Sequence, residues 1–183
     1  GIVSALLNIK RGGKGQVVDA AMVDGASVLM TMFYAFKASG FWLDERESNA
    51  LDGAAHFYDT YECADQKFLA VGSIEPQFYS TLLKKLEISD LKFQDQHNKE
   101  LWPELKTIMR DKIKEKTRDE WAEIFDGSDA CVAPILNLSE APEHHHMKAR
   151  NSFIEVDGVI QPAPAPRFSE TPPEIKHSAL KAG

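Results

Sequence analysis

The sequence predicts an α/β protein in which a central α+β unit is flanked on both sides by α/β segments. Two alternating runs, residues 56–63 and 67–73, are separated by three residues, which is typical of an antiparallel β-hairpin. Segments with helical spacing of apolar residues follow this hairpin. Residues 16–39 instead have a strand-then-helix order, which is typical of one unit of a parallel sheet.

The composition indicates how many domains the chain can form and argues against some classes of partner. The chain has 183 residues, of which 43% are hydrophobic and 27% charged, enough for one domain or two small ones around an apolar core. Its net charge of −7 argues against a nucleic acid or an anionic membrane as partner, because both are bound chiefly through Lys and Arg. No apolar run reaches the roughly 20 residues of a membrane span.

The N-terminal part is predicted to form a helix, a strand and a second helix. Residues 1–9 have the pattern of a helix end, closed by a glycine-rich and cationic stretch. Residues 16–22 are a short strand candidate. Asp24 is predicted to cap the next helix, whose apolar residues recur at helical spacing until Gly40 stops it.

The central unit begins after residues 43–55, a polar and charged stretch that marks a boundary. After the hairpin, a helix is predicted to start at Pro76. Thr117 and Glu120 have the spacing of a capping box and predict the start of a short helix. Between these two, a further amphipathic helix is outlined by Leu101, Leu105, Ile108, Met109 and Ile113.

The C-terminal part is predicted to contain less regular structure. Residues 126–129 form a turn, and residues 130–136 are a compact apolar strand candidate. A short helix is predicted to start at Ser139. Residues 153–161 are predicted to form a hairpin on an Asp-Gly turn, and a proline-rich tail follows.

One acidic residue, Glu75, stands where the second strand of the central hairpin meets the next helix. Because Pro76 favours the first helical turn, Glu75 is predicted at or just before the N-cap. The helix dipole there favours the carboxylate by roughly 0.3–1 kcal/mol, whereas burial among Phe68, Val71 and Ile74 would raise its pKa. Such opposed effects are typical of a catalytic carboxylate. The alternative is that Glu75 only caps the helix, with its side chain in water.

The histidines offer one further site candidate and no metal site. His56 opens a strand and is a candidate for a residue that lines a substrate site. The consecutive His144, His145 and His146 diverge by about 100° each on a regular helix, so they cannot chelate one metal ion there. We therefore expect no metal site at these histidines.

The cysteines and the ends of the chain bear on the compartment and the length of the protein. Cys63 and Cys131 form no CxxC motif, which favours two reduced core thiols. Since no signal-peptide pattern is present, we expect a cytoplasmic or organellar protein, mitochondrial or peroxisomal in a eukaryote, and not a secreted one. The N-terminus starts within an apolar helical pattern and the C-terminus stops without a packed element, so we expect a piece of a longer polypeptide.

Four stretches of the sequence form a specific combination: GKGQVVDAAMVDG (13–25), LDGAAHFYDTYECADQKFLAVGSIEPQFY (51–79), IFDGSDACVAPIL (124–136) and PAPRFSETP (164–172). Together they resemble the family III CoA-transferases and, within that family, the α-methylacyl-CoA racemases. They occur in the family's order and are spread over nearly the whole chain. The pairing of VGSIEPQFY with DGSDACVAP carries most of the resemblance.

The resemblance implies a fold with a large Rossmann-like domain and a small α+β domain. Residues 1–45 would end the N-terminal part of the large domain, with a strand and a long linking helix. Residues 46–140 would form the small domain, and residues 141–183 would start the return to the large domain. Family members are interlocked dimers, so a homodimer or other self-association is expected, with the active site between the large domain of one subunit and the small domain of the other.

The resemblance also implies a reaction, the inversion of C2 in a 2-methylacyl-CoA thioester through an enolate. In such enzymes a His, assisted by a Glu, works opposite an Asp, and the Glu matches Glu75. Ile74, Pro76 and Gln77 would line the path of the acyl-CoA, which supplies CoA as part of the substrate. The family's His and Asp lie on segments upstream of Gly1, so we expect the chain alone to be inactive.

Two other functions stay open at the level of sequence. One is a CoA-transferase proper, in which an Asp carboxylate attacks the thioester and forms an acyl anhydride. Transferases of the family tend to be glycine-rich where this chain has SIEPQ, which favours the racemase. The other is a non-catalytic module that oligomerises or binds an acyl-CoA without converting it.

Overall fold

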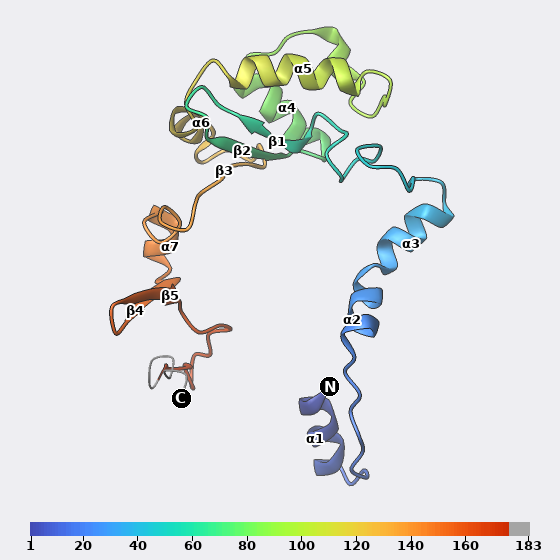
Figure 1. The fold of residues 1–183 in the computed structure, drawn as a ribbon, viewed down its shortest axis with the longest axis vertical. Helices are drawn as coiled ribbons and strands as arrows, with labels where there is room; N and C mark the ends of the chain where they lie inside the picture. Colours follow the sequence, from blue (N-terminus) through green and yellow to red (C-terminus); the bar gives the residue numbers. More distant parts are fainter. Residues whose placement is uncertain (176–183) are drawn as a thin grey trace, which may run out of the picture.

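The computed structural model describes residues 1–175, which form a central α+β unit with an arm on each side (Figure 1). The N-terminal arm carries α1 (Ile2–Lys10), α2 (Met22–Leu29) and α3 (Thr31–Ala38). Within the described residues, no helix is both long enough and apolar enough to cross a membrane. The end of the predicted return segment, residues 176–183, lies outside the described residues.

The N-terminal arm confirms the first predicted helix and corrects the strand after it. Residues 16–21 form no strand in the described structure, because no other strand lies beside them to pair with their backbone hydrogen-bonding groups. The predicted cap is wrong as well. Ala21 is the N-cap of α2. Asp24 lies in the first turn, where the helix dipole still stabilises a carboxylate.

The single long helix expected after Asp24 is divided at Met30. The Thr31 hydroxyl donates to the carbonyl of Val28 at 2.6 Å. Such a bond from a threonine back to the preceding turn competes with the helical pattern. The chain therefore continues as α3 after a one-residue break.

Most side chains of the N-terminal arm are exposed to solvent. In the described structure α1, α2 and α3 contain no buried residue, and Met22 and Leu29 are 91% and 82% exposed. Apolar surface of this extent marks an interaction site. We therefore expect the 183-residue chain to self-associate through this arm.

Sedimentation velocity over a range of concentrations measures this association. The sedimentation coefficient should rise with concentration, and lysine at both Met22 and Leu29 should weaken the rise. Leu138→Lys is the matched control, since Leu138 is equally exposed but lies outside the arm. A clean monomer at every concentration would contradict the prediction.

The central sheet is antiparallel and has three strands in the order β1-β2-β3: β1 (Tyr58–Glu62), β2 (Phe68–Gly72) and β3 (Val132–Pro134). The predicted hairpin with a three-residue loop is confirmed. The Cys63 amide donates to the Lys67 carbonyl at 2.8 Å, and Gln66 closes the loop with a φ of 62°. The strand predicted at residues 130–136 is β3, which pairs with the other side of β2.

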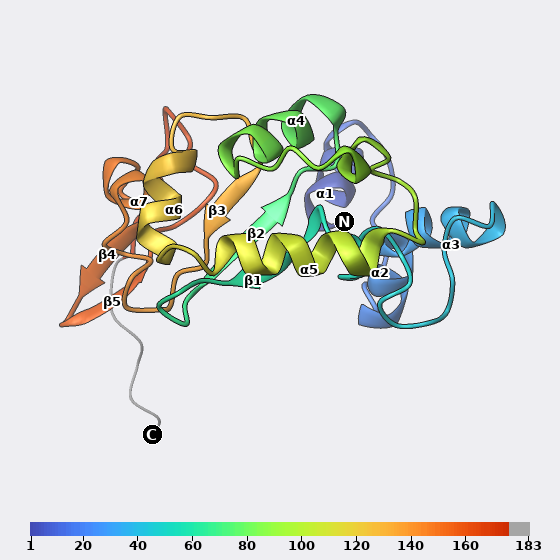
Figure 2. The ribbon, with the colours of Figure 1, turned by 90° about the horizontal axis from the view of Figure 1, so that it is seen from above.

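Three helices cover one face of this sheet: α4 (Pro76–Lys85), α5 (Trp102–Ile113) and α6 (Arg118–Phe125), with a short 3-10 helix η1 (Leu91–Gln94) between the first two. Seen from above, α5 runs along β1, α6 lies beside β3 and α4 lies near the end of β2 (Figure 2). The core therefore lies between one sheet and one helix layer, which confirms the predicted α+β centre. Its largest fully buried apolar side chains are Trp121, Tyr61, Phe57, Phe93, Leu69, Leu82, Leu86, Leu105, Met109 and Ile113.

The predicted capping box is present at the start of α6. The Thr117 hydroxyl accepts from the Glu120 amide, and the Glu120 carboxylate accepts from the Thr117 amide at 2.8 Å. The helix is held to the end of α5 by Trp121, whose Nε1 donates to the Ile113 carbonyl at 2.7 Å. Local capping and a buried aromatic contact thus fix the same helix.

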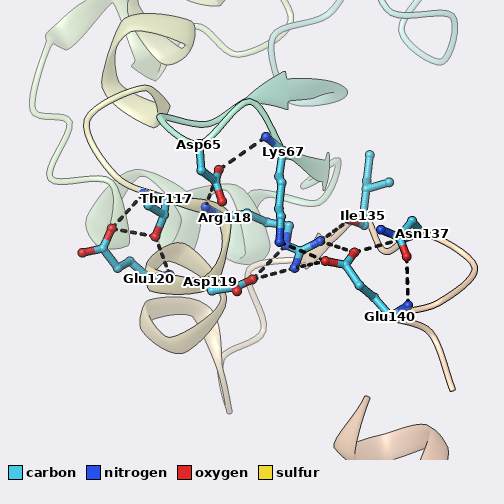
Figure 3. Close-up of polar contacts among 9 residues, drawn as sticks. All are labelled: Asp65, Lys67, Thr117, Arg118, Asp119, Glu120, Ile135, Asn137 and Glu140. Carbon is cyan, nitrogen blue, oxygen red and sulfur yellow. Dashed lines mark hydrogen bonds and ion pairs between the residues drawn. The ribbon is translucent and has the colours of Figure 1, made fainter. Parts of the chain in front are cut away.

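A polar network joins the hairpin loop, α6 and the segment after β3 (Figure 3). Arg118 is only 4% exposed and binds both carboxylate oxygens of Glu140, at 2.7 and 3.0 Å. Lys67 donates to the same carboxylate at 2.9 Å, and Asp65 accepts from the Arg118 amide at 3.2 Å. The hydrogen bond from Arg118 holds the pKa of Glu140 well below its usual range. The buried guanidinium is therefore fully paired.

The C-terminal arm contains α7 (His145–Ala149) and a hairpin of β4 (Phe153–Val156) and β5 (Val159–Pro162). The predicted Asp-Gly turn is confirmed, since Asp157 and Gly158 both have a positive φ. The helix predicted from Ser139 is wrong in extent. Residues 139–143 form turns, because the Asn137 side chain accepts from the Ser139 amide and Pro142 has no amide hydrogen to donate.

Candidate functional site

The candidate site is the turn between β2 and α4, where Glu75 lies. The Gly72 amide donates to the Cys131 carbonyl at 2.9 Å, and the Ser73 hydroxyl donates to the Ala130 carbonyl at 2.5 Å. The Ser73 amide donates to the Phe57 carbonyl at 3.0 Å. The bonds to Cys131 and Ala130 bring the VGSIEPQFY and DGSDACVAP stretches together in space.

Glu75 occupies the predicted place at the start of the helix. It is the N-cap of α4, with φ −74° and ψ 143°, and its carbonyl accepts from the Tyr79 amide at 2.9 Å. Its side chain makes no capping bond within the described residues and is exposed. Glu75 is thus held through its main chain, while its carboxylate is free to contact another group.

The expected burial of Glu75 among apolar residues is wrong in this structure. Inward and outward residues alternate along a strand. Val71 in β2 and Ser73 just after it are buried, and the chain then turns before Glu75 can enter the core. Phe68 lies at the opposite end of the strand and is itself exposed.

The neighbours of Glu75 lie where a ligand can reach them. Pro76 and Gln77 are exposed on the first turn of α4, and Ile74 is half-buried against the core. A hollow of about 490 Å³ on the outer face of the sheet is lined by Gly72 and Cys131. Another, of about 480 Å³ beside α4, is lined by Pro76. Residues on both sides of Glu75 therefore border open space.

Cys131 lies near this carboxylate. Partial burial raises the pKa of the Cys131 thiol, and the negative charges of Glu75 and Asp129 raise it further. The expectation of two core thiols holds for Cys63, which is buried, and fails for Cys131, which is exposed. Cys131 has a φ of 52° in the turn before β3, and this turn keeps it out of the core.

His56 lies inside the core and not on the surface that Glu75 occupies. It is 0% exposed, and its Nε2 is 2.7 Å from the Tyr79 hydroxyl. Its Nδ1 is buried without a partner among the described residues. Burial, and next the charge of His97, lower the pKa of His56 to about 4. The imidazole is therefore neutral at physiological pH and packs edge-on against Phe57.

One residue that holds this turn has no sequence signal. Gln96 lies in an irregular polar stretch, yet its side-chain amide donates to the carbonyls of Ser73 and Ile74, at 3.1 and 2.9 Å. Nothing in the spacing of this stretch predicts burial. The contact joins residues 22 and 23 positions apart and is visible only in the folded chain.

The fold and this turn agree with one class of protein. All residues from 1 to 183 match the model of CoA-transferase family III, and the chain belongs to this family. It is 46% identical over 174 residues to the alpha-methylacyl-CoA racemase of Mus musculus and 44% identical over 173 residues to that of Homo sapiens. Each match covers 94% of this chain and 45% of the relative, so the chain spans less than half the length of these curated relatives.

A solved structure supports the fold. The crystal structure of a CAIB/BAIF family protein from Brucella suis matches with a TM-score of 0.73 at 24% sequence identity. The match covers 98% of this chain and 48% of that one. The described arrangement of helices and antiparallel strands is therefore that of one half of a family member.

Proposed function

We propose that this chain is the C-terminal portion of an enzyme that racemises 2-methylacyl-CoA thioesters at C2. Residues 1–45 and 141–183 belong to a Rossmann-like large domain, and residues 46–140 form the small domain. The observation that carries the proposal is the state of Glu75. Its main chain is fixed at the start of α4, while its carboxylate is exposed and bonded to no other described residue.

The reaction needs two groups on opposite faces of C2. A base removes the C2 proton, and the electron pair of that bond moves into the thioester to give an enolate. An acid on the other face then donates a proton to C2, which inverts the centre. A His and an Asp supplied by polypeptide outside this chain do these two transfers, and Glu75 accepts a hydrogen bond from the imidazole and stabilises its charged form.

The surroundings of Glu75 serve the substrate. Ile74, Pro76 and Gln77 line the path of the acyl or pantetheine group, and CoA enters as part of the substrate with no separate cofactor. A homodimer brings the small domain of one subunit to the large domain of the other. The proposal includes a cytoplasmic or organellar location, and the two free thiols of Cys63 and Cys131 support it.

The alternative is CoA transfer through an aspartyl acyl anhydride, and the family to which the chain belongs favours it as the second candidate. The racemase is preferred because the mouse and human racemases are the relatives with 44–46% identity. The two reactions differ in what happens to the thioester bond. Racemisation leaves it intact, whereas transfer breaks it.

The test uses one C2 epimer of a 2-methylacyl-CoA in D₂O. The full-length polypeptide should incorporate deuterium at C2 and produce the other epimer, and the 183-residue chain alone should show no measurable exchange. Release of CoA with an acyl-enzyme trapped by hydroxylamine would establish the transferase instead. If neither reaction occurs at saturating substrate, the result would support a non-catalytic module that binds acyl-CoA or oligomerises.

A further inference from the structure

One buried side chain forms hydrogen bonds with the backbone just before Glu75. Gln96 is 7% exposed and lies between η1 and α5. Its Nε2 donates to two successive carbonyls, that of Ser73 at 3.1 Å and that of Ile74 at 2.9 Å. Both hydrogens of this amide nitrogen are thus directed at the peptide units that lead into Glu75.

Gln96 is itself anchored in the helix layer. Its main-chain carbonyl accepts from Nε1 of Trp102, the first residue of α5, at 2.9 Å. Trp102 is buried and packs edge-on against Phe57, with ring centroids 5.8 Å apart. The contact to the Glu75 turn is therefore a link from the packed core and not a mobile surface bond.

We infer that Gln96 is a positioning residue for the carboxylate of Glu75, a role that rests on the proposed function. The Glu75 side chain has no hydrogen bond of its own among the described residues, so its placement is set by the main chain. The first bond of α4 fixes the carbonyl of Glu75, and Gln96 fixes the two carbonyls before it. Together they hold the peptide units on both sides of the Glu75 Cα.

The competing interpretation is that Gln96 only satisfies two buried carbonyls and so contributes to stability. The two interpretations differ in which kinetic constant changes. A positioning role lowers kcat and leaves KM unchanged, because the amide is bonded to the carbonyls of Ser73 and Ile74 and acts through Glu75. A purely structural role lowers the unfolding temperature and leaves both constants of the folded enzyme unchanged.

Gln96→Met in the full-length polypeptide tests the inference, because methionine keeps the length of the side chain and removes the amide. We expect kcat for C2 exchange to fall by about 10- to 100-fold, the cost of a small misplacement of a catalytic group. Gln66→Met is the matched control, since Gln66 is exposed in the hairpin loop, at the far end of β2 from Glu75, and it should leave kcat unchanged. If Gln96→Met does not fold, Gln96→Asn, which keeps an amide one methylene shorter, should show a smaller fall in kcat at unchanged KM.

A double-mutant cycle with Glu75→Gln shows whether Gln96 acts through Glu75. In the Glu75→Gln background, Gln96→Met should cause no further fall in kcat, because the group that it positions is already gone. Multiplicative effects, or a wild-type kcat in both Gln96 variants, would overturn the inference and leave the proposed function intact. An unchanged kcat in Glu75→Gln itself would overturn the proposed function.

Discussion

Replacing Glu75 by glutamine in the full-length polypeptide is expected to lower C2 proton exchange by about 100- to 1,000-fold, a typical contribution of a group that takes part in proton transfer. Glutamine has nearly the same shape but carries no negative charge to stabilise an imidazolium. The change should appear in kcat, measured by deuterium incorporation in D₂O, with KM little altered. The fold should not change, because the Glu75 side chain makes no hydrogen bond within residues 1–175.

Glu100→Gln provides the control for this substitution. Glu100 is exposed at the start of the segment that leads into α5, and its replacement removes the same charge from a different surface. It should leave exchange unchanged. Equal rates for the wild type and Glu75→Gln would contradict the role of Glu75, and an equal loss in both variants would assign the effect to net charge.

The elements that could be predicted from sequence are those fixed by neighbouring residues. The capping box at Thr117 and the Asp157-Gly158 turn are confirmed, because their hydrogen bonds or backbone angles are set within a few residues. The three-residue loop that closes at Gln66 is local in the same sense. Such features need no knowledge of the rest of the fold.

The failures have the opposite cause. Residues 16–22 have the composition of a strand, but a strand forms only where another strand accepts its hydrogen bonds, and none lies beside them in the described structure. The break at Met30 depends on one hydroxyl of Thr31 and leaves the apolar spacing unchanged.

The candidate site divides in the same way. The place of Glu75 at the start of a helix follows from Pro76, which is next to it in sequence. Its exposure, and the Gln96 contact behind it, depend on how the turn packs against distant segments. The proposed catalytic role of Glu75 rests on the resemblance to the family, since no local pattern distinguishes that role from a simple cap.

His56 gives the second large prediction, an acid-dependent loss of stability in the 183-residue chain. In the unfolded chain the imidazole binds a proton near pH 6.5, whereas in the core burial lowers its pKa to about 4. Between these values the unfolded state binds more protons, so the free energy of unfolding falls as the pH falls. At about 1.4 kcal/mol for each pH unit, the loss is about 3 kcal/mol by pH 4.

Urea unfolding at pH 7.5, 6, 5 and 4 measures this loss. His56→Leu should be less stable at pH 7.5, because the Tyr79 hydroxyl loses its partner, but it should lose little more between pH 6.5 and 4.5. His145→Gln is the control, since His145 is exposed, and it should keep the wild-type dependence.

A second acid-sensitive group works in a lower pH range. Arg118 holds the pKa of Glu140 below its ordinary value of 4.5, so this pair stabilises the chain above that pH and is lost only below it. Loss of stability above pH 4.5 therefore belongs to the buried imidazole, whereas loss below that pH also includes Glu140 and the other carboxylates with lowered pKa, Asp52 and Glu120. A His56→Leu chain that still loses stability as steeply as the wild type between pH 6.5 and 4.5 would contradict this assignment, because the imidazole would then not be the group that the core keeps neutral.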